Sequence, residues 1–255
     1  MSEDKIERLR IVTRGYELGS NGSVPPSQYL RYLEHIRWST IAGSEKLPFR
    51  KFWWLGVVRS QVVEVHRQLG FNVEIELSMW MSRLGKTSVD FSHDIVRCED
   101  GQLIGRSTAT LVALDQNRRP SPIGEGAAEY LVSREAVRMD RLEEPIPETA
   151  WERHVPLRPS DHDLQQHVNH ARYADFVEDT RSLCADAGGY GPGEWNGPFR
   201  RLAITYEREV RLGDPAVART WCTAGRERSI DFVLMKEPGV VATRARVELA
   251  SGFAS

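Results

Sequence analysis

The sequence predicts an α+β protein built from two similar units in tandem, each with one helix followed by antiparallel strands. Tyr173 and Glu178 follow Tyr29 and Glu34 by the same 144 residues, so a helical pattern recurs at a fixed distance. Runs of alternating apolar and polar residues, typical of half-buried strands, come after each helix. One strongly bent sheet wrapped around each helix would bury its apolar face.

The first helix is expected to begin just after Ser23, because Pro25 and Pro26 suit a first turn where a missing N–H costs nothing. Its apolar face recurs at helical spacing through Tyr29, Tyr32, Leu33 and Ile36. We expect it to end near Gly43, with a short strand over residues 12–18 before it. Strands are predicted at 57–65, 73–81, 89–95 and 103–114, with a hairpin turn at 99–102.

The second unit repeats this order after a turn-rich connector. We expect a strand at 154–158, a helix from about Val168, and strands near 202–212, 217–223, 230–236 and 240–249. The segment Ser229-Ile230-Asp231-Phe232 echoes Ser88-Val89-Asp90-Phe91. These patterns predict one domain over residues 1–130, a linker over 131–150 and a second domain over 151–255. The two sheets are expected to be continuous, since pairing would protect their edge strands.

A cluster of reactive side chains precedes the second helix. Asp163, Gln165, His167 and Asn169 supply a carboxylate, a carboxamide, an imidazole and a second carboxamide within seven residues. This set suits attack on an activated carbonyl, because a carboxylate can serve as base or nucleophile and an imidazole can move a proton. The first unit has Gly19, Ser23 and Pro25 in place of Asp163, His167 and Asn169. We therefore predict that its motif is degenerate.

The segment from Asp163 to Tyr173 resembles the Asp-x-Asn-x-His-Val-Asn-Asn signature of acyl-acyl carrier protein thioesterases, which are double hot-dog enzymes. The segment Tyr206 to Val210 is similar to a Tyr-Arg-Arg-Glu segment of that family, and residues 115–125 resemble the end of its first hot dog. The resemblance implies a tandem hot-dog fold and hydrolysis of an acyl thioester to free acid and thiol. It also implies that Glu209 belongs to the active site.

The sequence departs from that signature at three positions. Gln165 and His170 stand where the family has asparagine, and Val210 stands where some members have cysteine. Glutamine keeps the carboxamide but moves it one methylene further out, which puts activity or substrate range in doubt.

The resemblance and the chemistry together assign roles. Asp163 would be the base or nucleophile, His167 would relay a proton, and Gln165 would hold water or the thioester oxygen. Val168 and Asn169 would bind substrate, because a helix start there offers N–H groups to an oxyanion. Simpler roles compete: Asp163 and Asn169 also suit helix or turn caps. Glu209 falls on the polar face of its predicted strand, where a solvated carboxylate is the default.

The first unit is expected to bind the acyl chain, although plain core packing is the competing role for each candidate. The candidates are the large apolar residues Trp38, Trp53, Trp54, Met79 and Met81. Four arginines near the start of the second sheet would suit an acidic carrier protein or the phosphates of coenzyme A. They are Arg200, Arg201, Arg208 and Arg211.

Composition narrows the remaining classes. The net charge of −2 provides no basic field for nucleic acid, and no apolar run approaches the roughly 18–20 residues of a membrane span. The polar start lacks a signal-peptide core, so a cytoplasmic protein is expected. The three cysteines form no CxxC pair, and we expect neither a metal nor a cofactor. A homodimer stays open.

Two other functions remain. Hot-dog dehydratases use His-x3-Gly-x4-Pro and hydratases use Asp-x4-His, and neither spacing occurs around His167. The other alternative is an acyl-binding or regulatory protein whose hydrolytic site has decayed, a reading that Gln165 keeps open.

Overall fold

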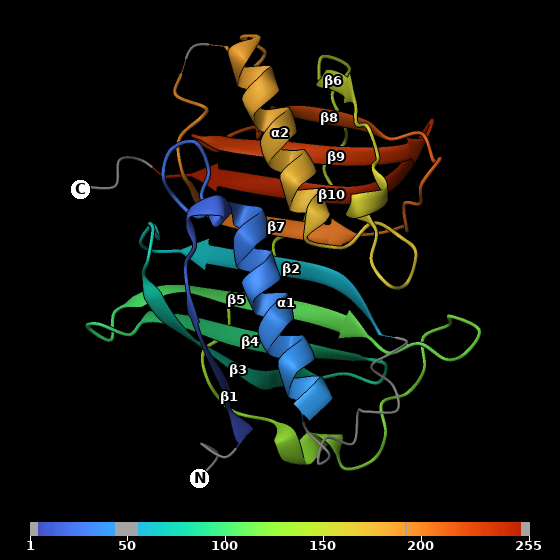
Figure 1. The fold of residues 1–255 in the computed structure, drawn as a ribbon. Coiled ribbons are helices and arrows are strands. Elements are labelled where there is room, and N and C mark those ends of the chain that lie inside the picture. The colour runs from blue at the N-terminus through green and yellow to red at the C-terminus, as the bar shows by residue number, and fades with distance from the viewer. Residues whose placement is uncertain (1–4, 44–55, 192, 251–255) are drawn as a thin grey trace. The chain divides into compact units, whose positions relative to one another are not determined.

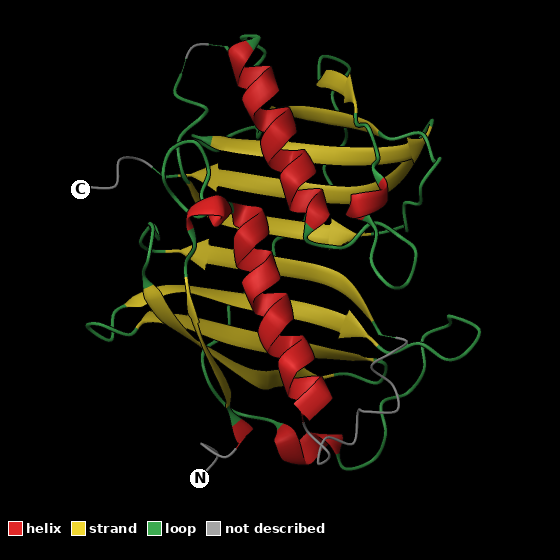
Figure 2. Ribbon diagram, in the orientation of Figure 1, coloured by secondary structure: helices red, strands yellow, loops and turns green. Residues whose placement is uncertain are grey.

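Each helix of the structure lies across an antiparallel sheet (Figure 1), and loops join the strands (Figure 2). The computed structural model describes residues 5–43, 56–191 and 193–250. The chain divides into two compact units. Unit 1 comprises Met1–Val24 and Tyr29–Met139, and unit 2 comprises Pro25–Gln28 and Asp140–Ser255.

Unit 1 has the strand order β1-β3-β4-β5-β2, with every pair in this unit antiparallel. The apolar stripe of its helix is buried as predicted, since Tyr29, Leu33 and Ile36 are at most 1% exposed. Its elements are β1 (Glu7–Val12), α1 (Pro26–Gly43), β2 (Val57–Val65), β3 (Glu74–Leu84), β4 (Ser88–Arg97) and β5 (Leu103–Val112).

Unit 2 has the strand order β7-β10-β9-β8-β6, again with antiparallel pairs. Its helix buries Tyr173, Phe176 and Val177. Its elements are β6 (Trp151–His154), α2 (Arg172–Asp186), β7 (Phe199–Tyr206), β8 (Val217–Cys222), β9 (Ser229–Glu237) and β10 (Val240–Leu249). The two units thus have the same strand connectivity.

The strands predicted just before each helix were placed too late in the sequence. Residues 12–18 and 154–158 were expected to be extended, but β1 ends at Val12 and β6 ends at His154. A short 3₁₀ turn follows each strand, at Gly15–Glu17 and at Pro159–Asp161. The last residue of each turn folds back, so its carboxylate accepts a backbone N–H three residues earlier. This local bond competes with the extended conformation.

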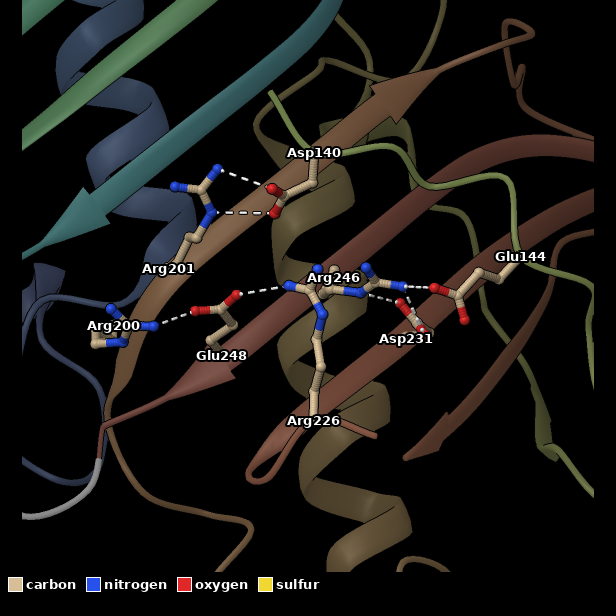
Figure 3. A network of polar contacts seen from close by, with 8 residues as sticks. All are labelled: Asp140, Glu144, Arg200, Arg201, Arg226, Asp231, Arg246 and Glu248. Carbon is tan, nitrogen blue, oxygen red and sulfur yellow. Dashed lines mark hydrogen bonds and ion pairs between the residues drawn. The ribbon is translucent and has the colours of Figure 1, made fainter. Parts of the chain in front are cut away.

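The connector between the units forms contacts at both of its ends. Val132 N–H donates to the Met81 carbonyl at 2.9 Å in unit 1, and Arg134 lies over the Trp80 ring at 4.6 Å. In unit 2, Asp140 accepts two hydrogen bonds from Arg201, at 3.1 and 3.2 Å (Figure 3). Residues 77–81 of β3 are all buried, so this strand is not half-buried as its alternation predicted, and the contacts at Trp80 and Met81 contribute to that burial.

A network of ion pairs joins side chains of β7, β9 and β10 in unit 2 (Figure 3). At its centre, Arg246 is 2% exposed and donates to Asp231 at 2.7 and 3.1 Å and to Glu144 at 2.8 Å. Glu248 pairs with Arg200 and, at 3.3 Å, with Arg226. Because Arg246 is buried, its charge requires these carboxylates.

Within the described part of the chain, neither helix combines the length and the apolar character that crossing a membrane would require.

Candidate functional site

The loop before α2 is closed by two backbone hydrogen bonds. Asp163 N–H donates to the His167 carbonyl at 3.1 Å, and Gln166 N–H donates to the Asp163 carbonyl at 3.0 Å. The turn requires a positive φ of 60° at Gln166, a conformation that glycine adopts more readily than glutamine. This closure brings Asp163, Gln165 and His167 together at the start of the second unit's helix.

The Asp163 carboxylate lies 3.7 Å from His167 Nδ1, with the side chains 27% and 14% exposed. This separation exceeds a direct hydrogen bond but allows one water or a small rotation to connect the two groups. Asp163 Oδ1 also accepts the Gln165 backbone N–H at 2.8 Å. The oxygen that stabilises the turn is therefore also the one nearest the imidazole.

The imidazole of His167 lies between two carbonyl-type acceptors. Nε2 is 3.3 Å from Gln165 Oε1, and Nδ1 is 3.3 Å from the Val168 carbonyl oxygen. A neutral imidazole can donate to only one of them, whereas an imidazolium can donate to both. The ring is thus held in place by two groups that accept hydrogen bonds.

The helix begins later than predicted. We expected it near Val168, with free N–H groups there, but α2 starts at Arg172. Val168 N–H donates to the Val210 carbonyl at 2.8 Å, and Asn169 N–H donates to the Asp161 carbonyl at 2.9 Å. Both N–H groups are therefore occupied and cannot bind an oxyanion in this conformation, because each donor already has an acceptor.

Asn169 forms a turn just before α2. Its Oδ1 accepts the Ala171 N–H at 2.9 Å, and its backbone carbonyl accepts the Arg172 N–H at 2.9 Å. The N-cap residue of α2 is Ala171, without a side-chain cap, so Asn169 stabilises the turn that leads into the helix and not the cap itself. A contact of Asn169 with substrate remains a prediction.

Glu209 does not lie on a strand, because β7 ends at Tyr206 rather than near residue 212. The alternation argument for its polar-face position is therefore wrong. Its neighbour Val210 is fully buried and accepts the Val168 N–H, so the backbone of Glu209 lies next to the loop that precedes α2. The Glu209 carboxylate is 34% exposed and 3.2 Å from Arg211.

Asp161 anchors the loop, and the sequence analysis did not single it out. Its carboxylate is 1% exposed and accepts Arg172 Nε and Nη2 at 2.9 and 2.6 Å. The other oxygen accepts the Arg158 N–H at 2.7 Å. One carboxylate thus ties the 3₁₀ turn to the first residue of α2. One sequence signal could have indicated Asp161. The equivalent position of unit 1, 144 residues earlier, also carries a carboxylate, Glu17.

The tyrosine of the motif is structural. Tyr173 and Tyr206 pack edge to face with ring centroids 5.5 Å apart, and Tyr206 donates to the His170 carbonyl at 3.0 Å. Burial raises the pKa of Tyr173 above its ordinary value, so this phenol stays neutral and is not a base.

The large apolar residues predicted for acyl binding fall into three groups. Met79 and Met81 are buried on β3, at 4% and 3% exposed. Trp38 on α1 is 39% exposed, which does not fit a core role. Trp53 and Trp54 lie outside the residues that the structure describes.

Part of this chain, including the loop before α2, is similar to known proteins. Residues 165–234 match the family model described as Thioesterase superfamily, a segment that starts at Gln165 and includes Glu209. Oleoyl-acyl carrier protein thioesterase 2 of Arabidopsis thaliana is 22% identical over 194 residues, 66% of this chain and 52% of that protein. Oleoyl-acyl carrier protein thioesterase 1 of the same plant is 22% identical over 204 residues, 69% and 55% respectively. The chain spans about half the length of these curated relatives.

Solved structures agree over nearly the whole chain. An acyl-ACP thioesterase from Bacteroides thetaiotaomicron has a TM-score of 0.81 at 16% identity, covering 97% of this chain and 99% of its own. The 12:0-ACP thioesterase from Umbellularia californica has a TM-score of 0.80 at 20% identity, covering 97% of each chain. The chain therefore has the double hot-dog fold, as predicted, and the predicted resemblance to acyl-acyl carrier protein thioesterases is confirmed.

Proposed function

We propose that this protein hydrolyses an acyl thioester, releasing a free acid and a thiol, and that unit 2 carries the catalytic site. The observation that carries this proposal is the closed loop that holds Asp163, Gln165 and His167 together. The similarity to acyl-ACP thioesterases supports the same chemistry.

The reaction can be written with these side chains. Asp163 takes a proton from water as the water oxygen bonds to the thioester carbonyl carbon, which gives a tetrahedral oxyanion. Gln165 Oε1 faces His167, so its amide NH₂ remains to donate to that oxyanion. When the carbon–sulfur bond breaks, the thiolate receives a proton through His167. Direct attack by Asp163 would form an anhydride that water then opens, with the same products.

Glu209 is proposed as a second carboxylate of the site. Its support is the Val168–Val210 hydrogen bond at 2.8 Å, which joins its segment to the catalytic loop. Its carboxylate also forms an ion pair with Arg211 at 3.2 Å, and its side chain is 34% exposed.

An acyl carrier protein is the proposed donor, with coenzyme A as the alternative. The arginines predicted for docking are largely neutralised: Arg200 pairs with Glu248, Arg201 with Asp140 and Arg211 with Glu209. Because local carboxylates balance these three charges, and Arg208 donates to the Glu207 carbonyl, the arginines give little support to an acidic docking partner.

Thiol release from acyl groups of graded length, presented on both carriers, tests the function. We expect turnover by the natural chain and a loss of about a thousandfold in Asp163→Ala, without loss of folding. The matched controls are Asn21→Ala and Ser23→Ala, which alter the equivalent positions of unit 1 and should leave turnover unchanged. Tight acyl binding without turnover would favour the alternative of an acyl-binding or regulatory protein with a decayed site.

A further inference from the structure

The core of unit 1 contains polar side chains that the hydrolytic loop does not use. His93 on β4 and Gln61 on β2 are both 0% exposed. Among the described residues, neither ring nitrogen of His93 has a hydrogen-bond partner of normal geometry, although the Ser107 backbone approaches the ring, and Gln61 Oε1 has no donor. An unsatisfied buried polar group is destabilising, so these positions need an explanation.

The polar groups are adjacent on one face of the sheet. His93 pairs across the strands with Ser107 and with Met79, and Gln61 Nε2 donates to Ser107 Oγ at 3.3 Å. Arg37 of α1 is 4% exposed and lies close enough to act on the charge of His93. Burial first, and this guanidinium second, lower the pKa of His93 well below its ordinary value. The ring is therefore neutral at physiological pH.

The equivalent core of unit 2 is apolar at the same positions. The echo of Ser88–Phe91 by Ser229–Phe232 aligns His93 with Leu234, and the strand registers align Gln61 with Ile204. Both are 0% exposed. The fold thus accepts leucine and isoleucine here, so packing alone does not demand histidine and glutamine.

We propose that the core of unit 1 binds the hydroxyl group of a hydroxylated acyl chain through Gln61 and His93. A hydroxyl donates one hydrogen bond and accepts others, which satisfies the Gln61 carbonyl oxygen and the imidazole N–H together. A carboxylate or ketone has no hydrogen for Gln61 Oε1. The inference rests on the proposed function, because it assigns a substrate class to a thioesterase whose first unit holds the acyl chain.

Binding of free fatty acids to the whole protein tests this without hydrolysis. The probes have equal length and are either unsubstituted or hydroxylated near the carboxyl end, in mid-chain or at the far end. By calorimetry, we expect one hydroxylated isomer to bind about tenfold or more tightly than the unsubstituted acid. Equal binding, or tighter binding of the unsubstituted acid or of a dicarboxylic acid, would overturn the proposal.

Two variants that copy unit 2 make the test specific. His93→Leu and Gln61→Ile should each abolish the preference for the hydroxylated isomer and raise the melting temperature, since each removes an unsatisfied group. Thr243→Val, a buried polar change on β10 of unit 2, is the control and should keep the preference. If His93→Leu lowered the melting temperature and kept the preference, His93 would be structural and the proposal wrong.

The outcomes also separate this proposal from the hydrolytic one. A hydroxy-acid preference without thiol release would defeat the proposed hydrolysis and leave this site standing. Thiol release with no preference for a hydroxylated acid would support the proposed hydrolysis and overturn the hydroxyl site.

Discussion

Residues 19–23 of unit 1 and 163–167 of unit 2 form the same loop with different chemistry. Gly19 N–H donates to the Ser23 carbonyl at 2.8 Å, as Asp163 N–H does to His167 at 3.1 Å. The residue after each loop also donates its backbone N–H to a distant carbonyl: Val24 to Leu69 at 2.9 Å and Val168 to Val210 at 2.8 Å. The positive φ is also shared, 75° at Gly22 and 60° at Gln166. The loop's shape therefore does not depend on a catalytic aspartate or histidine.

The comparison also corrects one expectation about unit 1. We predicted a degenerate motif because Pro25 replaces the carboxamide of Asn169, but Asn21 supplies a carboxamide at the position equivalent to Gln165. Asn21 Oδ1 accepts the Ser23 N–H at 3.0 Å, so it is turned onto its own loop. In unit 1 the residue equivalent to His167 is Ser23, so Asn21 has no imidazole to contact. The pair of a carboxamide and an imidazole, Gln165 and His167, therefore occurs in the loop of unit 2 and not in that of unit 1.

Copying unit 1 into unit 2 gives the largest expected effect. His167→Ser should lower kcat by about 10²–10⁴-fold, because the proton donor is lost. Stability should be nearly unchanged, because Ser23 supports the same turn. Steady-state thiol release and a thermal melt measure the two effects. Full activity in this variant would show that His167 has no part in the chemistry.

The anchors beneath the two loops differ in strength. Asp161→Ala would leave Arg172, which is 30% exposed, without its 1% exposed partner, and we expect a loss of about 2–3 kcal/mol. Glu17→Ala removes the acceptor of the Tyr32 hydroxyl, at 2.6 Å, and should cost about 1–2 kcal/mol. Urea unfolding compares them, and a smaller loss at Asp161 than at Glu17 would contradict this order.

The two cores should respond differently to pH. The folded pKa of His93 lies below its unfolded value near 6.5, so below that pH the unfolded chain binds more protons than the folded chain. Its contribution to stability is therefore complete above about pH 6.5 and decreases as the pH falls, by up to about 1.4 kcal/mol per pH unit. His93→Leu should flatten this dependence in urea unfolding between pH 7 and 5. An unchanged slope would mean that His93 can be protonated in the folded state.

The smallest effect is expected at the left-handed residues. Gln166→Gly should stabilise the protein by about 0.5–1 kcal/mol, because glycine adopts positive φ without strain. Gly22→Ala should destabilise it by a similar amount. Chemical unfolding can resolve both changes. If Gln166→Gly destabilised the protein, the glutamine side chain would contribute more than its backbone costs.

Patterns within each unit predicted the helices and the order of the strands along the chain. They could do so because burial of one helix face and alternation along strands are local properties. The start of α2 was missed since the Val168 N–H bonds to Val210, 42 residues later, a contact that no local pattern reveals. The end of β7 at Tyr206 was missed for the same reason. One motif was enough to predict that Asp163, Gln165 and His167 lie together, which the loop confirms. Asp161 was missed because no local pattern shows that its carboxylate folds back onto Arg158 and Arg172.

The position of β10 has a consequence for how unit 2 assembles. This strand is the last that the structure describes, yet it lies between β7 and β9. It also carries Arg246 and Glu248 of the ion-pair network. While the ribosome still holds this segment, β7 and β9 have exposed edges facing a gap, and such edges invite pairing with other chains. Unit 2 is thus vulnerable to aggregation until β10 inserts between β7 and β9.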